Sequence, residues 1–392
     1  MTTHLPQTVW PQRPDLAALT EALGADSVRW VGGAVRDTLL GADVHDVDAA
    51  TTHAPERVIE LCTSADIRTV PTGIDHGTVT AVLEGGPVEI TTLRRDVATD
   101  GRRATIAYAS EWKDDAARRD FTINALYAHP ATLEISDYFG GLDDLEARRV
   151  RFIGNAEQRI AEDHLRILRY YRFQARFGAD LDSEAEEACA KMAGTLKGLS
   201  RERIADELLK LLILPAPFDT VARMHRRDVL GVVLPETTTD QIETLGRLIQ
   251  DEAEQAVPLA PIRRLAALLP PSKEIADTCA ARLRLSKAQR ARLINAAQRD
   301  PSDTQSPLAL AYKVGAEFAQ DRLLLLGEDS RMLAEYDPPQ FPLRGGQIVA
   351  RGVAAGPEVA RMLQSIERRW ISEGFPSAAR VAELLDEELR QI

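Results

Sequence analysis

The feature that most constrains the fold is a change of hydrophobic periodicity along the chain. Up to about residue 128, short β-rich runs alternate with helical runs, which predicts a small mixed sheet with helices. After Asp144 the apolar residues recur mainly with the 3.6-residue period of α-helices. The 392 residues also exceed the roughly 300 at which a single core stops growing. We therefore expect an α+β chain, with a mixed N-terminal domain followed by all-helical domains.

The predicted elements of the first 128 residues are short. Helices are predicted at 15–23, 34–40 and 55–64, and strands at 27–31, 45–49, 78–83 and 88–93. Residues 97–115 are polar and lack a clear period, so we predict a long loop there. In the rest of the chain the strongest helical patterns lie at 160–177, 204–212, 239–255 and 286–299.

Charge and cysteine content restrict the partners and the compartment. A net charge of −12 argues against general, charge-driven nucleic-acid binding, because that binding depends on Lys and Arg neutralising phosphates. We expect any RNA contact to be local, and we expect no DNA or membrane partner. The residues from Leu145 to Phe177 hold a local excess of eight arginines over four acids. The three cysteines lie far apart and no export signal is visible, which favours a reducing cytoplasm.

Two glycines and two aspartates near the N-terminus form the densest candidate site. Gly32 and Gly33 lie between a predicted strand and a predicted helix, where backbone N–H groups can approach a phosphate without hindrance from a Cβ atom. Asp46 and Asp48 are two apart on a predicted strand, so both carboxylates face one side while Val47 points into the core. Hard divalent cations prefer such oxygen ligands. Taken alone, each pattern is also typical of a turn or a solvent-facing strand.

Two further positions extend this candidate site. Arg36 is expected to pair with a phosphate or with the neighbouring Asp37. Glu89 is a carboxylate within an otherwise apolar strand. A third acid near two others suits a pair of metal ions that activates a 3′-hydroxyl and steadies the leaving pyrophosphate.

The segment RRDFTINA at 118–125 follows the predicted loop and brings charged residues to an apolar stretch. Arg118 and Arg119 offer donors that match triphosphate oxygens. Asp120 is expected to accept a hydrogen bond from a ribose 2′-hydroxyl, which would favour NTPs over dNTPs. The alternative is a helix N-cap with surface arginines.

A third cluster lies on the predicted helix that begins near residue 160. Asp163 and Arg166 are i and i+3 there, so their head groups are expected to lie side by side. Such a pair offers an acceptor beside a donor, which matches the exocyclic amine and ring nitrogen of cytosine and adenine. Uracil and guanine present the opposite order. The alternative is an intrahelical salt bridge.

Taken in this order, these segments resemble the class II tRNA nucleotidyltransferase and bacterial poly(A) polymerase family, most closely its CCA-adding members. The resemblance covers residues 27–212 and rests on VGGAVRDTLLG (31–41), HDVDAATTHAPERV (45–58), PTGIDHGTVTAV (71–82), VEITTLR (88–94), RRDFTINALYA (118–128), DYFGGLDDL (137–145), EDHLRILRYYRF (162–173) and SRERIADELLKLL (200–212). Beyond residue 215 it is thinner, although 341–370 looks like a tail segment of these proteins.

The resemblance implies a polymerase-β-like head, a helical neck, a body and a tail, at 1–140, 141–215, 216–335 and 336–392. It also implies that Asp46 and Asp48 hold Mg²⁺, that Glu89 lies close to the metal, and that all three are catalytic. Asp163 and Arg166 would act as a protein template for CTP and ATP. The residues expected to bind the nucleotide are Gly33, Arg36, Arg119, Asp120, Asn124, Asp163, Arg166, Arg169 and Arg172.

Within the family we favour complete CCA addition to a tRNA that lacks its 3′ CCA end. The motif RRDFTINALYA favours a tRNA substrate over the poly(A) polymerase alternative. Enzymes that add only two cytidines resemble the complete ones except for a shorter loop, and here the stretch 96–115 is long and contains Arg102 and Arg103. A third alternative is an RNA-binding protein that lost turnover, which the intact acids at 46, 48 and 89 disfavour.

Overall fold

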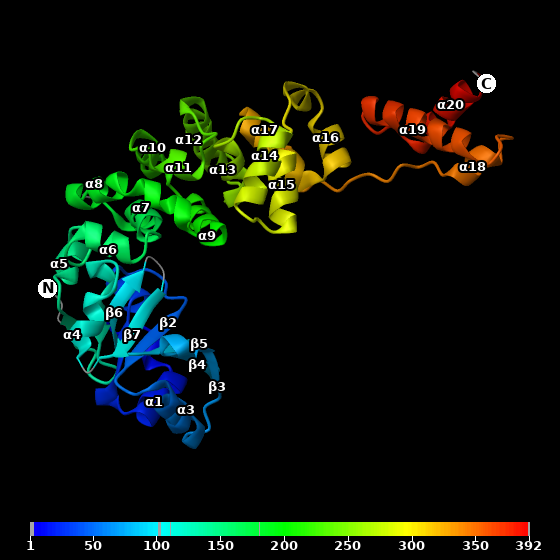
Figure 1. The fold of residues 1–392 in the computed structure, drawn as a ribbon. Coiled ribbons are helices and arrows are strands. Elements are labelled where there is room, and N and C mark those ends of the chain that lie inside the picture. The colour runs from blue at the N-terminus through cyan, green and yellow to red at the C-terminus, as the bar shows by residue number, and fades with distance from the viewer. Residues whose placement is uncertain (1–3, 101–102, 110, 180, 391–392) are drawn as a thin grey trace. The chain divides into compact units, whose positions relative to one another are not determined.

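The computed structural model describes residues 4–100, 103–109, 111–179 and 181–390, with the side chains of 95–107 excluded. The chain forms two compact units, Met1–Pro235 and Glu236–Ile392. Unit 1 contains a sheet region, residues 4–140, and a helical region, residues 141–235 (Figure 1). The regular elements described in unit 2 are all helices, joined by loops. The predicted α+β class is therefore confirmed, whereas the finer division into head, neck, body and tail stays a prediction.

The sheet region is built on a mixed sheet of seven strands in the order β3-β4-β5-β2-β1-β8-β9. Its strands are β1 Val28–Val31, β2 Val47–Thr51, β3 Thr69–Gly73, β4 Thr78–Leu83, β5 Gly86–Thr92, β8 Leu126–Ala128 and β9 Ile135–Asp137. Among the described strands of this sheet, β2 and β5 are the parallel pair, and the other neighbours run antiparallel. Strands β2 and β5 therefore bring residues from two distant parts of the sequence side by side.

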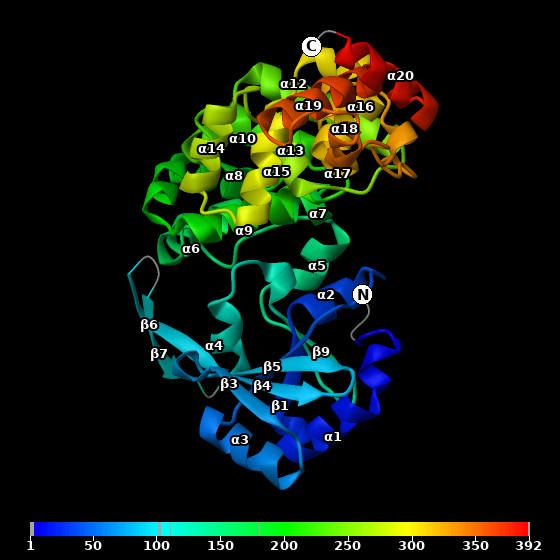
Figure 2. The ribbon, with the colours of Figure 1, turned by 90° about the vertical axis from the view of Figure 1, so that its right-hand side faces the viewer.

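Two helices, α1 (Pro14–Leu23) and α3 (Pro55–Ser64), lie side by side in both ribbon views (Figure 2). Each begins with proline in its first turn, where the missing N–H costs no hydrogen bond. Each helix turns apolar residues inward, with Leu19 in α1 and Val58 in α3 almost inaccessible to solvent. A third helix, α2 (Gly33–Leu39), follows β1 directly. The three helices predicted in this region are confirmed to within one residue at each end.

The long loop predicted at 97–115 is wrong. Strands β6 (Arg94–Asp100) and β7 (Arg103–Tyr108) form an antiparallel hairpin, and helix α4 (Trp112–Ala117) follows. The sequence Asp100-Gly101 is typical of hairpin turns, and the polar composition hid this signal. Arg102 lies outside the described residues, and Arg103 is described by its backbone alone.

The helical region of unit 1 contains α5 Gly141–Glu146, α6 Ala156–Glu162, α7 Arg166–Phe177, α8 Ser183–Lys191, α9 Arg201–Leu212, α10 Phe218–Arg226 and α11 Val229–Val233. Unit 2 contains α12 Thr239–Glu254, α13 Pro261–Ala267, α14 Lys273–Arg282, α15 Lys287–Ala297, α16 Pro307–Val314, α17 Ala316–Leu326, α18 Gly345–Val349, α19 Pro357–Ser372 and α20 Ala378–Leu389. Several of these helices begin at a residue that caps them. Ser286, for example, accepts from the backbone N–H of Gln289, whose side chain accepts in return from the backbone of Ser286.

Unit 2 has an ionic cluster at its centre. Arg263 and Arg264 are almost fully buried and both pair with Glu252 at 2.7 Å, while Arg263 also reaches Asp321 at 3.2 Å. Removing one member of such a cluster leaves a buried charge without compensation, which is strongly destabilising. No helix of the described chain is both long and apolar enough to cross a membrane.

Candidate active site

Asp48 and Glu89 lie opposite each other on the parallel strands β2 and β5. Residues that pair directly across neighbouring strands point to the same face of the sheet, so the two carboxylates share one face, on strands about 4.8 Å apart. Strand β2 begins at Val47, two residues later than predicted, so Asp46 precedes the strand and is exposed. Val47 is buried, as the alternation predicted. The sequence-predicted acids are thus brought to one place by the sheet.

The environment of Asp48 is electrostatically unfavourable for its own charge. Burial raises the pKa of Asp48 to about 6, with further contributions from the negative charges of Glu89 and Asp46. Arg119 acts in the opposite direction but does not offset them. In the part of the chain that is described, no group of three or more His, Cys, Asp or Glu side chains is arranged to hold a metal ion. An oxygen-donor pair whose charge is poorly compensated nevertheless fits a hard divalent cation that completes its shell with substrate oxygens.

The glycine pair forms the turn from β1 into α2. Gly32 has φ 72° and ψ −124°, a conformation that is open almost only to glycine, and Gly33 is the first residue of the helix. A Cβ atom on Gly32 would lie 3.7 Å from Nη1 of Arg119. The turn therefore lies beside an arginine that also influences Asp48.

Arg36 is turned into the protein. Its side chain donates to Oδ1 of Asp37 at 2.8 Å and to Oδ1 of Asn124, and its guanidinium lies 4.5 Å from the ring centre of Phe177. Only 4% of Arg36 is exposed. Of the two predicted partners, the structure shows Asp37, and Arg36 ties the sheet region to α7.

Arg119 is held by two residues that sequence reasoning missed, Tyr127 and Asp115. Its Nε donates to the hydroxyl of Tyr127 at 2.9 Å, and its Nη2 reaches Asp115 at 3.3 Å. Tyr127 in turn donates to Asp115 at 2.6 Å. Tyr127 pairs with Val31 in β1, and Val31 pairs with Asp48 in β2. The strand register thus places the Arg119 network next to the carboxylates, which the spacing along the chain does not reveal.

Asp120 links the sheet region to the helical region of unit 1. Its Oδ1 accepts from the backbone of Phe121 and from Asn124, at 2.9 and 3.0 Å, and its Oδ2 accepts from Nε of Arg169 at 2.8 Å. Burial alone would raise the pKa of Asp120. The charge of Arg169 and the hydrogen bond from Asn124 outweigh that effect, so the pKa lies well below the usual range. Both oxygens are thus occupied by the protein, and contact with a ribose stays a prediction.

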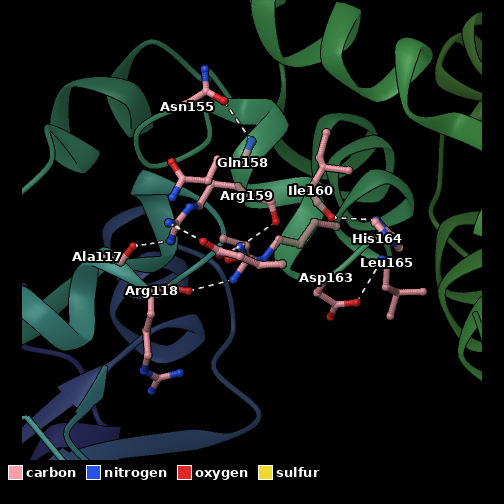
Figure 3. A network of polar contacts seen from close by, with 12 residues as sticks. Ala117, Arg118, Asn155, Gln158, Arg159, Ile160, Asp163, His164 and Leu165 are labelled. Atoms are coloured by element: carbon pink, nitrogen blue, oxygen red, sulfur yellow. Dashed lines mark hydrogen bonds and ion pairs between the residues drawn. The ribbon is translucent and has the colours of Figure 1, made fainter. Parts of the chain in front are cut away.

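Asp163 and Arg166 do not lie on one helix, which corrects the prediction of a continuous helix at 160–177. Helix α6 ends at Glu162 and α7 begins at Arg166, while Asp163 has an extended backbone with φ −148° and ψ 104°. The side chain of Asp163 accepts from the backbone N–H of Leu165 at 3.1 Å (Figure 3). Short polar side chains compete with helix formation in this way, which explains the break.

The intrahelical salt bridge between Asp163 and Arg166 is not formed either. Arg166 donates to Glu162 at 2.6 Å and to the backbone oxygen of Arg118 at 2.8 Å. Asp163 instead pairs with Arg203 of α9 at 2.7 Å. Arg166 is thereby anchored to the segment that carries Arg119, and Asp163 is anchored to a helix that sequence reasoning did not connect with it.

Helix α9 also holds two arginines of α7. Glu207 accepts from Nε of Arg172 at 2.7 Å and lies 3.8 Å from Arg169. Only 4% of Glu207 is exposed. Arg203 and Glu207 belong to the motif SRERIADELLKLL (200–212), which carries part of the family resemblance, but the spacing of that motif predicts neither ion pair.

The mixed sheet, the carboxylates on adjacent strands and the glycine turn define a polymerase-β-like nucleotidyltransferase. Two family models match the chain, the poly A polymerase head domain over residues 28–151 and the probable RNA and SrmB-binding site of polymerase A over residues 178–241. The chain belongs to the class II CCA-adding enzymes of the poly(A) polymerase and tRNA nucleotidyltransferase family.

This membership rests on similarity along most of the chain. It is 34% identical to CCA tRNA nucleotidyltransferase 1, mitochondrial, of Homo sapiens, over 92% of this chain and 87% of that protein. It is 31% identical to the CCA-adding enzyme of Lactiplantibacillus plantarum, over 96% and 95%. The CCA-adding enzyme of Bacillus stearothermophilus in complex with CTP has the same fold, with a TM-score of 0.74, 25% identity and coverage of 97% and 99%.

Proposed function

We propose that this chain adds cytidine, cytidine and adenosine to the 3′ end of a tRNA that lacks CCA, with CTP and ATP as substrates. The observation that carries the proposal is the placement of Asp48 beside Glu89 on adjacent parallel strands, with Asp46 directly before one of them. Relatives that share most of the length of this chain bear the names CCA tRNA nucleotidyltransferase and CCA-adding enzyme. Solved structures of the same fold include complexes with tRNA, CTP and ATP.

In the proposed reaction, the terminal 3′-oxygen of the tRNA attacks the α-phosphorus of the nucleotide. The new bond forms as the bond to pyrophosphate breaks, so each addition releases one pyrophosphate. Asp46 and Asp48 would hold Mg²⁺, and Glu89 would add a third negative charge beside them, which strengthens the attraction for the cation. When bound, the metal would favour ionisation of the 3′-hydroxyl and offset the charge of the triphosphate.

The residues around the carboxylates would bind the triphosphate. The turn at Gly32 and Gly33 leads into the first turn of α2, whose backbone N–H groups have no carbonyl partner within the helix, and Arg119 adjoins the same turn. Tyr127 and Asp115 fix the guanidinium of Arg119, so that it needs little reordering when a phosphate arrives.

Asp163 and Arg166 would select the base. The contacts of Arg166 with Glu162, Arg159 and Arg118 use three of its five N–H donors, which leaves donors for a ring nitrogen. An ionised Asp163 accepts hydrogen bonds and cannot donate, so it suits the exocyclic amine of cytosine and adenine. Uracil would place a carbonyl oxygen against the carboxylate.

Incorporation of labelled CTP into a tRNA transcript without CCA tests the assignment of the carboxylates. We expect Asp46→Ala to abolish incorporation while tRNA binding stays close to that of the parent. Incorporation by the parent should stop in EDTA and return with added Mg²⁺. Turnover by Asp46→Ala comparable to the parent would refute the metal-binding role.

We also propose that the chain works in a reducing, cytoplasmic compartment. Cys62, Cys189 and Cys279 are all free and buried, and burial raises the pKa of each thiol. The vertebrate relatives carry the word mitochondrial in their names, so the two locations need to be separated by experiment. Cell fractionation should place the protein in the cytosol, and enrichment in an organelle fraction would contradict the proposal.

A further inference from the structure

The ion pair between Asp163 and Arg203 connects the proposed base-selecting carboxylate to a second helix. Nη2 of Arg203 lies 2.7 Å from Oδ2 of Asp163, and each side chain is 30% exposed. The other carboxylate oxygen accepts from the backbone N–H of Leu165. Asp163 is therefore fixed at both oxygens by groups that are not part of the nucleotide.

Arg203 is itself held in a defined position. It lies in the first turn of α9, where the Ser200 side chain accepts from its backbone N–H. Glu207 lies four residues later on the same face of the helix and pairs with Arg172 of α7. Two ion pairs one turn apart thus fix α9 against the segment that begins at Asp163.

We propose that Arg203 is a specificity-determining positioning residue, which orients the Asp163 carboxylate toward the exocyclic amine of CTP and ATP. This inference rests on the proposed function of Asp163. A carboxylate has about four acceptor sites, so the bonds to Arg203 and Leu165 leave room for a base amine. Arg203 therefore assists the base rather than competing with it.

The geometry also explains why a single acid can discriminate between bases. Without Arg203, Asp163 would be held by one backbone N–H and could rotate about its side-chain torsions. A mobile carboxylate can move away from the carbonyl oxygen of uracil and so avoid the repulsion that a fixed one would impose. Loss of Arg203 should thus weaken the rejection of UTP more than it weakens the use of CTP.

The test compares single additions of CTP and UTP by the full-length protein with Mg²⁺ and a tRNA transcript that lacks CCA. We expect Arg203→Gln to lower the ratio of kcat/KM for CTP over UTP by about tenfold, the loss typical of one hydrogen bond to a charged group. Arg203→Lys retains the charge and should lose less. Arg201→Gln is the matched control, because Arg201 lies on the same turn and donates to the backbone oxygen of Lys197.

A merely structural role for Arg203 would lower the rates with both nucleotides equally and leave the ratio unchanged, which would overturn the inference. If Arg203→Gln fails to fold, Arg203→Lys decides the matter, since an unchanged ratio in that variant also contradicts it. Asp163→Ala is measured alongside. If Asp163→Ala leaves the ratio unchanged, the template role proposed above is wrong; if only Asp163→Ala changes it, the role of Arg203 alone is wrong.

Discussion

Asp120 and Arg169 join the sheet region of unit 1 to its helical region through two hydrogen bonds from one guanidinium to one carboxylate oxygen, at 2.8 and 2.5 Å. Asp120 follows α4, and Arg169 lies in α7, 49 residues farther along the chain. Asn124 connects the same carboxylate to Arg36 and so to the glycine turn. The glycine turn, which is proposed to bind phosphate, and helix α7 are thereby linked through protein side chains.

Asp120→Asn should destabilise the protein by about 1–3 kcal/mol, because it leaves the Arg169 guanidinium without its main counter-charge. Urea unfolding monitored by circular dichroism measures this change. The matched control is Asp206→Asn, which breaks an exposed pair with Lys210 and should cost no more than about 0.5 kcal/mol. Equal losses in the two variants would contradict the linking role.

The stability difference between the parent and Asp120→Asn should depend on pH. The pKa of Asp120 is lower in the folded chain than in the unfolded one, so its contribution is fully present at neutral pH. That contribution should begin to fall below about pH 5 and decrease further as the carboxylate is protonated. Unfolding curves at several pH values check this, and a difference that grows in acid would have the wrong sign.

Asp48→Asn should stabilise the protein in EDTA while it abolishes incorporation. The pKa of Asp48 is raised to about 6, so the ionised carboxylate is a cost to folding above that pH and no cost below about pH 4. Removal of the charge should gain up to about 3 kcal/mol at pH 8. Thermal unfolding in EDTA at pH 8 and at pH 4 gives the comparison. A variant less stable than the parent at pH 8 would show that the charge is well compensated.

Gly32→Ala should cost about 1–3 kcal/mol and reduce nucleotide incorporation, because the alanine Cβ is strained at φ 72° and ψ −124°. Gly33→Ala is the stability control. Gly33 lies in the helix, and a Cβ there would meet only Nη2 of Arg36 at 3.8 Å, an ordinary contact. Thermal melting of both variants separates the effects, and equal melting temperatures would refute the strain argument.

The periodic elements of the chain could be predicted from the sequence. Helix α3 matches its predicted bounds at both ends, because proline marks its first turn and its apolar residues recur at helical spacing. The placement of Asp48 on one strand and Glu89 on another was also predictable, although strand alternation alone does not show that the two strands are neighbours. That information came from the resemblance.

The errors lie where polar side chains direct the backbone. The break at Asp163 depends on one bond from a side chain to the backbone of Leu165, which cannot be distinguished from an ordinary helical aspartate by periodicity. The hairpin of β6 and β7 was hidden by its polar composition. Arg203 was missed because helix packing brings it to Asp163 from 40 residues away in the sequence. Asp115 lies only four residues before Arg119, but it was missed because helix α4 was predicted as part of a loop, and Tyr127 was missed because strand register places it beside them.

The central claim is tested most directly by incubating the purified protein and Mg²⁺ with a tRNA transcript lacking its CCA end and all four NTPs, then sequencing the 3′ ends. The account predicts that CCA is added and that extension stops there. Products ending in CC would indicate a partial enzyme, and long adenosine tails would indicate a poly(A) polymerase. Failure to extend any RNA, with tRNA binding intact, would contradict the account and leave an RNA-binding protein without turnover.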